Sequence, residues 1–183
     1  MWWKLIGLPL VLVGLDQYTK YLTVQHMTLG ESIPILGDIV RLTFIRNAGM
    51  AFGIQVSNQM FFTSLSVAVM VLIAWSLYRV RHASWMFWLP LSMIFGGAIG
   101  NIIDRVMVGN VVDFMDVDIP DFHFPGWDVG LFQIPSYELL RWPVFNVADS
   151  AITVGMVILL IVSFFGQEPE MVSRPAAETE SLS

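Results

Sequence analysis

The sequence predicts an all-α membrane protein with four transmembrane helices, a small extracytoplasmic β-cradle and an outer insertion of surface loop and short helix. Composition is the first reason, since 56% of the 183 residues are hydrophobic and 13% are charged, with a mean hydropathy of +0.68. Soluble domains average about 45–50% apolar and about 25% charged residues. The second reason is a set of long apolar segments, which we expect to span the membrane at about 5–25, 58–78, 84–104 and 144–166.

The first of these segments carries polar residues in its second half. Leu5–Leu15 is apolar, but Asp16 and Lys20 follow. A cleaved signal peptide with Lys4 as its charged end is the alternative interpretation. No small-x-small cleavage site follows, and the two charges stand where a cleavage region would be neutral. We therefore favour a span whose outer half carries function.

The other three segments are almost free of charge. No charged residue occurs in 47–78 or 83–103, and Asp149 is the single charge within 144–166. Four spans would place both termini on one side of the membrane. Lysine and arginine totals tie between the two sides, so the orientation rests on the compact basic turn Arg79–His82, which we place in the cytoplasm.

Two outer segments connect the expected spans. Asp38–Arg46 alternates apolar and polar residues, which predicts outer strands within about 33–55. The second segment, about 114–142, contains three prolines and many aromatic residues, so we expect it to lie on the membrane surface rather than form one helix. Residues 1–167 then form one membrane domain, and the polar, acidic residues 168–183 form a disordered tail.

Polar residues converge at one level of this topology. Ionisable groups within a membrane are costly, so each of them indicates a functional site. Gly97, Asn101 and Asp104 follow i, i+4, i+7 spacing and share one helix face, and Asn146 and Asp149 share another. The residues that we expect at this outer level are Asp16, Lys20, Asn47, Gly97, Asn101, Asp104, Arg105, Asp113, Asn146 and Asp149.

Structural roles are open alternatives for several of these residues. Asp16 and Lys20, at i and i+4, can form a purely structural ion pair. Asp104 can form an interfacial salt bridge with Arg105 as readily as serve catalysis. For the pair Asp113 and Asp149, joint action and separate structural roles are about equally supported by the residues alone. A solvated face is the expected role of the remaining acidic residues, Asp116, Asp118, Asp121 and Asp128.

The residue types restrict the chemistry. The three histidines are scattered, so a zinc protease motif is absent, and no serine is patterned with Lys20. There is no cysteine and no glycine-rich phosphate loop, and the net charge of −6 comes without a basic stripe. We therefore expect no metal, no cofactor and no nucleic-acid partner. A pair of carboxylates remains, and in a site of low dielectric such a pair holds one proton between its members.

Five motifs resemble those of bacterial lipoprotein signal peptidase (signal peptidase II), an aspartyl membrane protease family. They cover about residues 5–166 and occur in the family's order. The matching stretches are Leu15–Lys20, Arg46–Gly53, Gly96–Arg105, Val111–Phe114 and Phe145–Ser150.

The resemblance implies a function and assigns roles. It implies that Asp113 and Asp149 form the catalytic dyad, with Asp16, Lys20, Asn47, Gly97, Asn101, Arg105 and Asn146 as the family's other functional positions. Asp104 is kept with this supporting set. The implied reaction is cleavage of prolipoproteins on the amino side of a diacylglyceryl cysteine, at the outer face of the bacterial inner membrane. The family has both termini in the cytoplasm, contacts membrane lipids and is inhibited by globomycin-type cyclic peptides.

One departure from the family pattern is the long separation between the two aspartates. Residues 116–141 look like an insertion, and our hypothesis is an enlarged surface lid that contacts lipid or the signal-peptide helix. Two other functions remain as alternatives: a transporter or channel that uses intramembrane aspartates, and a non-catalytic membrane scaffold. A transport path should place polar groups at several depths, whereas the inner halves of the second and fourth spans are nearly free of ionisable residues.

Overall fold

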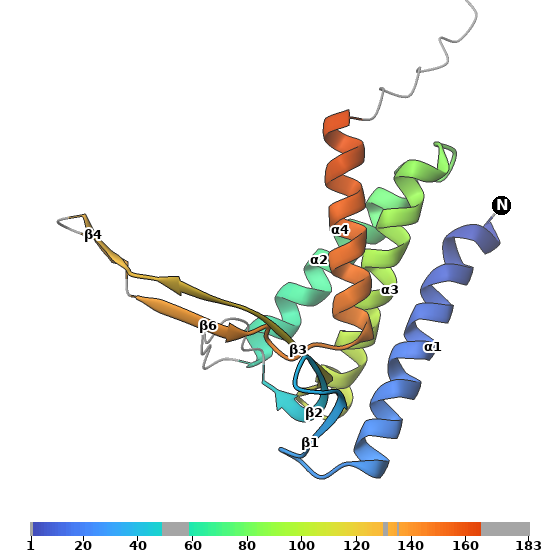
Figure 1. Cartoon of the computed structure of the whole chain (residues 1–183). Helices are drawn as coiled ribbons and strands as arrows, with labels where there is room; N and C mark the ends of the chain where they lie inside the picture. The colour runs from blue at the N-terminus through green and yellow to red at the C-terminus, as the bar shows by residue number, and fades with distance from the viewer. Residues whose placement is uncertain (1, 49–58, 130–131, 135, 166–183) are drawn as a thin grey trace, which may run out of the picture.

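The computed structural model describes residues 2–48, 59–129, 132–134 and 136–165, and four helices form its main body. The helices lie side by side, with a β-sheet across one end of the bundle (Figure 1). Each helix covers one of the four apolar segments. The bounds are α1 Trp2–His26, α2 Gln59–Arg79, α3 Trp85–Met107 and α4 Val147–Phe165.

The expected all-α class is wrong, because strands make up a substantial part of the chain. A four-stranded antiparallel sheet has the order β1-β2-β3-β6, and a separate two-stranded sheet pairs β4 with β5. A small β-cradle was expected, but the sheet extends well beyond it. The strands are β1 Ser32–Leu36, β2 Val40–Asn47, β3 Val111–Phe124, β4 Trp127–Val129, β5 Phe132–Ile134 and β6 Tyr137–Arg141.

The expected number of spans is also corrected. Within the described residues, α3 and α4 are the two helices that are long and apolar enough to cross a membrane. The polar residues in the second half of α1 lower its hydropathy, and several of them are buried against other parts of the protein. α2 is 21 residues long, and Thr63–Arg79 is its described apolar part.

The segment that follows α3 forms strands, not the expected surface loop and short helix. β3 pairs through Val111–Val117 with β2 and through Asp118–Phe124 with β6. Pro120 argued against a regular element here, but it falls where the register between β3 and β6 shifts, and proline is tolerated at such irregularities. The outer half of β3, with β6 and the β4–β5 hairpin, reaches away from the bundle (Figure 1).

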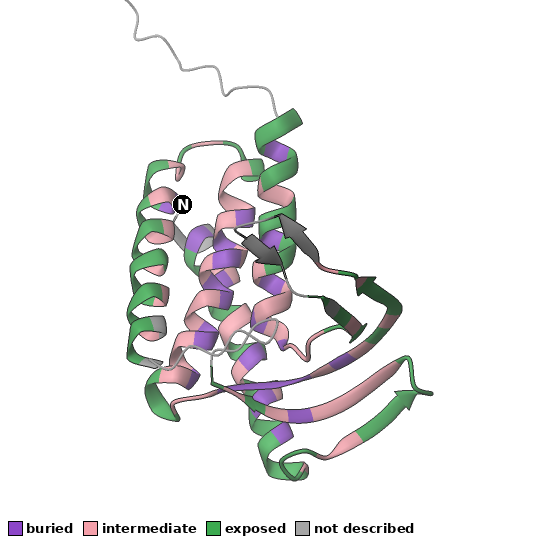
Figure 2. Cartoon of the chain, turned by 90° about the vertical axis from the view of Figure 1, so that its left-hand side faces the viewer, coloured by how far each residue is buried: buried purple, intermediate pink, exposed green. Residues whose placement is uncertain are grey.

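Close packing around α3 positions the site. A side chain at Gly96 would meet the backbone of Pro9 in α1 at 2.9 Å, and one at Gly97 would meet the backbone oxygen of Ala148 in α4. Small residues allow such close approach between membrane helices. Buried residues therefore line the inner faces of the helices and the start of β3, while the outer faces of the helices are largely exposed (Figure 2).

Candidate active site

Asp113 lies on β3 at the end of the helix bundle that the sheet covers. Its side chain is fully enclosed, with the residue 1% exposed. Both carboxylate oxygens accept hydrogen bonds from side-chain amides: Oδ2 from Asn47 Nδ2 at 3.0 Å and Oδ1 from Asn146 Nδ2 at 2.7 Å. The neighbours that satisfy this carboxylate are thus neutral amides.

Asp149 lies in the first turn of α4, where Asn146 precedes the helix. The backbone N–H of Asp149 donates to Asn146 Oδ1 at 2.9 Å, and the backbone N–H of Asn146 donates to Asp149 Oδ2 at 3.2 Å. This reciprocal pattern is that of a capping box, which satisfies two free N–H groups at a helix N-terminus. Asp149 Oδ1 also accepts a bond from Asn101 Nδ2 on α3 at 2.8 Å.

Two asparagines connect the carboxyl groups of Asp113 and Asp149. Asn146 donates to Asp113 through its side chain and to Asp149 through its backbone, and it also donates to Asn101 Oδ1 at 3.1 Å. Backbone bonds between Met115 and Phe145, at 2.7 and 3.0 Å, attach the segment before α4 to β3. The fold therefore brings the two aspartates, distant in sequence, onto one asparagine.

A second polar cluster lies beside the first and has a positive charge at its centre. Lys20 Nζ lies 2.8 Å from Asp16 Oδ2, 2.9 Å from Asp104 Oδ2 and 3.0 Å from Asn101 Oδ1. An ammonium group has three donors, so these three acceptors satisfy it. Asp16 is 0% and Lys20 is 3% exposed. The predicted pairing of Asp16 with Lys20 is present, whereas Asp104 pairs with Lys20 and not with its neighbour Arg105.

The carboxylates of this second cluster also hold the backbone beside each member of the first. Asp104 Oδ2 accepts a bond from the backbone N–H of Val112 at 3.0 Å, next to Asp113. Asp16 Oδ1 accepts one from the backbone N–H of Ala148 at 2.9 Å, next to Asp149. The Lys20 cluster thus positions β3 and the start of α4 relative to α1 and α3.

A cavity of about 640 Å³ between α2, α3 and α4 opens onto Asp149. Its polar end contains Asn47, Asn101 and Arg105 in addition to Asp149. Its walls are largely apolar and include Leu65, Val69, Ile73, Ile152 and Met156. This shape can accept an extended or helical apolar peptide segment, with one of its backbone peptide bonds next to the Asp149 carboxylate. Asp113 lies behind this surface, bonded to Asn47 and Asn146.

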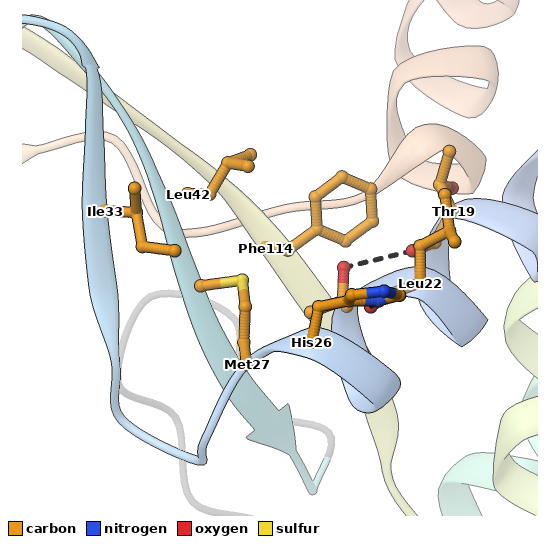
Figure 3. A pocket seen from close by; sticks show the side chains of 8 residues that line it. Thr19, Leu22, His26, Met27, Ile33, Leu42 and Phe114 are labelled. Carbon is orange, nitrogen blue, oxygen red and sulfur yellow. Dashed lines mark hydrogen bonds between the residues drawn. The ribbon is translucent and has the colours of Figure 1, made fainter.

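A second cavity, of about 440 Å³, lies between the end of α1 and the sheet (Figure 3). Its lining is largely apolar and includes Leu22, Met27, Leu42 and Phe114. Successive residues of a strand point to opposite faces, so Phe114 faces this cavity while Asp113 faces the asparagines. No carboxylate belongs to its described lining. His26 is the titratable residue of this lining, whereas Asp149 lines the first cavity.

Burial controls the acidity of Asp113. Loss of solvent raises its pKa to about 7, the negative charge of Asp149 adds to the increase, and the hydrogen bonds from Asn47 and Asn146 oppose it. A carboxyl group with this pKa exchanges a proton near neutral pH. The arrangement can therefore supply both a proton donor and a proton acceptor at one place.

Sequence reasoning left out two contributors to this region. Gln17 Nε2 donates to Asp104 Oδ1 at 3.0 Å and joins α1 to α3. Asp116, expected on a solvated face, is 7% exposed, pairs with Arg141 at 2.8 Å and accepts a bond from Thr43 at 2.7 Å. The alternation of β2 places Thr43 on the polar face with Arg41, where a polar partner could have been expected. Asp118 and Asp121 are exposed as expected, and the side chain of Asp128 lies outside the described residues.

Potential metal ligands are not grouped in the part of the chain that the structure describes. No cluster of three or more histidine and acidic side chains there is arranged to hold an ion. The described site therefore offers carboxyl groups, amides and two cations, Lys20 and Arg105, for its chemistry.

Comparison with known proteins identifies the family. The family model described as "Signal peptidase (SPase) II" matches residues 8–165. A lipoprotein signal peptidase from Brevibacillus brevis is 43% identical over 164 residues, which cover 90% of this chain and 95% of the relative. The lipoprotein signal peptidase of Syntrophus aciditrophicus is 36% identical and covers 86% of this chain and 89% of its own.

Two solved structures, both titled bacterial membrane enzymes, share the fold. One aligns with a TM-score of 0.70 and 27% identity over 93% of both chains. The other aligns with a TM-score of 0.69 and 29% identity over 90% of this chain and 94% of its own. The asparagine-linked aspartates thus lie within a chain that matches these proteins over nearly its whole length, and the chain belongs to the signal peptidase II family of membrane proteases.

Proposed function

We propose that this protein is an aspartyl endopeptidase that removes signal peptides from diacylglyceryl-modified prolipoproteins, with Asp113 and Asp149 as its catalytic dyad. The relatives are named lipoprotein signal peptidases, which supports the substrate class. The observation that carries the proposal is the contact of both carboxyl groups with Asn146, at the end of a cavity with apolar walls.

The dyad holds one proton in the resting enzyme. The ionised member takes a proton from a water molecule, which attacks the carbonyl carbon of the scissile peptide bond. The protonated member donates a hydrogen bond to the carbonyl oxygen and stabilises the negative charge that develops there. The tetrahedral intermediate then collapses as the dyad returns a proton to the leaving amine. Because the groups are coupled, the proton belongs to the pair and not to one residue.

The other polar residues position the dyad and the substrate. Asn47, Asn101 and Asn146 orient the carboxyl groups through the hydrogen bonds described above. Arg105 lines the cavity beside Asp149, where its guanidinium can bind the substrate backbone or the charge of the intermediate. Asp16, Lys20 and Asp104 hold the surrounding backbone, and Gly97 allows α3 and α4 to approach closely.

The enzyme acts at the outer face of the bacterial inner membrane, with both termini in the cytoplasm. The basic turn between α2 and α3 and the start of α1 lie at the end of the bundle opposite the sheet (Figure 1), and the positive-inside rule favours the cytoplasm for that end. The lipidated cysteine of a substrate lies at the opposite surface, at the depth of Asp149. Residues 1–167 form the peptidase domain, lipids surround it, and globomycin-type peptides bind in the cavity. Residues 168–183 form the polar tail that the sequence predicts, and they lie outside the described residues.

The test is cleavage of a purified diacylglyceryl prolipoprotein by Asp113→Asn and Asp149→Asn enzymes in lipid. Loss of an acid–base group lowers turnover by roughly 10²–10⁴-fold, and we expect at least this loss for each variant. Asp121→Asn, at an exposed acidic position, is the matched control and should retain activity. Cleavage by either dyad variant at the wild-type rate, with the product identified by mass spectrometry, would overturn the assignment.

A further inference from the structure

The most unusual part of this molecule is the β-arm, which we define as β3 beyond Val117 together with β4, β5 and β6. Its base is fixed by Arg141, which pairs with Asp116 at 2.8 Å and donates to the backbone oxygen of Asp38 at 3.0 Å. Beyond that point the arm leaves the main body and extends away from the helix bundle to one side (Figure 1).

The register of the arm places an apolar pair and a charged pair on opposite faces. Phe122 lies opposite Leu139, and His123 lies opposite Glu138. Residues opposite each other in an antiparallel pair share a face, and neighbours along a strand point to opposite faces. One face therefore carries Phe122 and Leu139, and the other carries His123 and Glu138, whose side chains lie 3.2 Å apart, together with Leu140, which is 59% exposed. Phe122 is 58% exposed, so this chain does not cover it.

The charges of the arm exclude attraction to anionic headgroups as the main binding force. Residues 118–141 contain no lysine, and their single arginine, Arg141, is paired with Asp116 and Asp118. Four acidic residues lie in the same range: Asp118, Asp121, Asp128 and Glu138. The range also contains three phenylalanines, one tryptophan and one tyrosine, and tryptophan and tyrosine favour the interface between water and hydrocarbon. An apolar mode of binding fits this composition.

The base of the arm lies next to the start of α4, a helix long and apolar enough to cross a membrane. β3 continues into the arm. Its residue Met115 forms backbone hydrogen bonds with Phe145, directly before the apolar helix α4. An arm that leaves there runs next to the bilayer. Among the described residues, β6 is an edge strand and β3 beyond Asp118 has no strand partner on its β2 side, and open strand edges cannot be satisfied in hydrocarbon. The headgroup layer satisfies both the polar edges and the apolar face.

We propose that the β-arm is an interfacial membrane anchor that lies in the headgroup layer, with the Phe122–Leu139 face toward the acyl chains and the His123–Glu138 face toward water. This inference does not depend on the proposed peptidase activity. A signal-peptide helix is the competing occupant of the same face, and the experiment separates the two.

The test uses the absence of cysteine from the chain, which allows labels to be placed without background. Single cysteines replace Phe122, His123, Glu138 and Leu139 in the full-length enzyme, each labelled with a nitroxide in phosphatidylcholine bilayers. Collision rates with oxygen, which concentrates in lipid, and with a water-soluble nickel chelate are then compared. All four positions lie on the surface and outside the active site, and wild-type cleavage activity verifies the fold of each labelled enzyme.

The expected result is an alternation that follows the register. The ratio of oxygen to nickel collisions should be several times higher at 122 and 139 than at 123 and 138, without substrate and at both low and high salt. Equal exposure of all four labels to water would overturn the proposal. Protection of 122 and 139 that develops on addition of a signal-peptide substrate, and not before, would also overturn it and would identify the face as a substrate-docking surface.

Discussion

Two neighbouring clusters in this protein each contain a pair of aspartates and differ in whether a cation lies between the carboxyl groups. The Asp16–Lys20–Asp104 cluster places an ammonium group between two buried carboxylates, at 2.8 and 2.9 Å. The Asp113–Asp149 cluster has no cation among its direct hydrogen-bond donors in the described residues, since the bonds come from Asn47, Asn101 and Asn146.

The difference teaches what each cluster can do. A buried carboxylate paired with an ammonium group serves as a fixed structural acceptor. A buried carboxylate whose hydrogen-bond donors are neutral amides has no charge to offset its desolvation, which favours the protonated form. The pKa of Asp113 accordingly rises to about 7. The Asp16–Lys20–Asp104 cluster should therefore mainly determine stability, and the Asp113–Asp149 cluster should mainly determine catalysis.

The largest expected change in stability follows from removing the central cation. Lys20→Met would leave the Asp16 and Asp104 carboxylates buried and uncompensated, and breaking a buried ion pair in this way costs about 3–5 kcal/mol. Thermal unfolding in detergent should show a large decrease in midpoint relative to wild type and to the exposed-site control Asp121→Asn. A midpoint within the error of the control would show that the Lys20 cluster is not structural.

Asp113→Asn should have a smaller effect on stability, and it should stabilise the protein at pH 8 instead of destabilising it. The carboxyl binds its proton more tightly in the folded state than in the unfolded state, where the pKa is near 3.8, so stability falls as pH rises toward about 7. This group should cost the wild type roughly 2–3 kcal/mol between pH 5 and pH 8, and the variant should not show that cost. If the free energy of unfolding changed by the same amount in the two enzymes between pH 5 and pH 8, the prediction would be contradicted.

The smallest predicted effect is a shift in the pH profile of Asn47→Ala. The Asn47 amide stabilises the ionised form of Asp113, so its loss raises the pKa of Asp113 further. The alkaline limb of kcat/KM against pH should then move to higher pH, because the required proton is retained longer. The folded structure should persist, with an unfolding midpoint near that of wild type. A limb that moves to lower pH would reverse the assigned role of this hydrogen bond.

The sequence was sufficient to locate the helices. Uncharged apolar runs predicted the positions of α2, α3 and α4 to within a few residues, because their composition has no other stable environment than lipid or a buried core. Helical spacing then placed Asn101 and Asp104 on one face, and the structure brings both to Lys20. Their exact partners depend on packing between helices, which spacing does not specify.

The strands were harder to predict because local signals conflicted with tertiary pairing. Pro120 indicated an irregular loop, yet backbone bonds to β2 and β6 impose an extended conformation on the whole of β3. The burial of Asp116 likewise depends on Arg141, which is 25 residues away. The number of spans was overestimated because α1 gives its polar half to the Lys20 cluster instead of to lipid.

The most direct measurement is infrared difference spectroscopy of the lipid-embedded enzyme as pH is raised. A carboxylic acid band should disappear with a midpoint near pH 7, as the pKa of Asp113 requires. The band should be lost in Asp113→Asn, and in Asp149→Asn it should titrate at lower pH because a neighbouring negative charge has been removed. If no carboxyl group titrates near neutral pH, or if the band is unchanged in Asp113→Asn, the two aspartates do not share a proton and the account is contradicted.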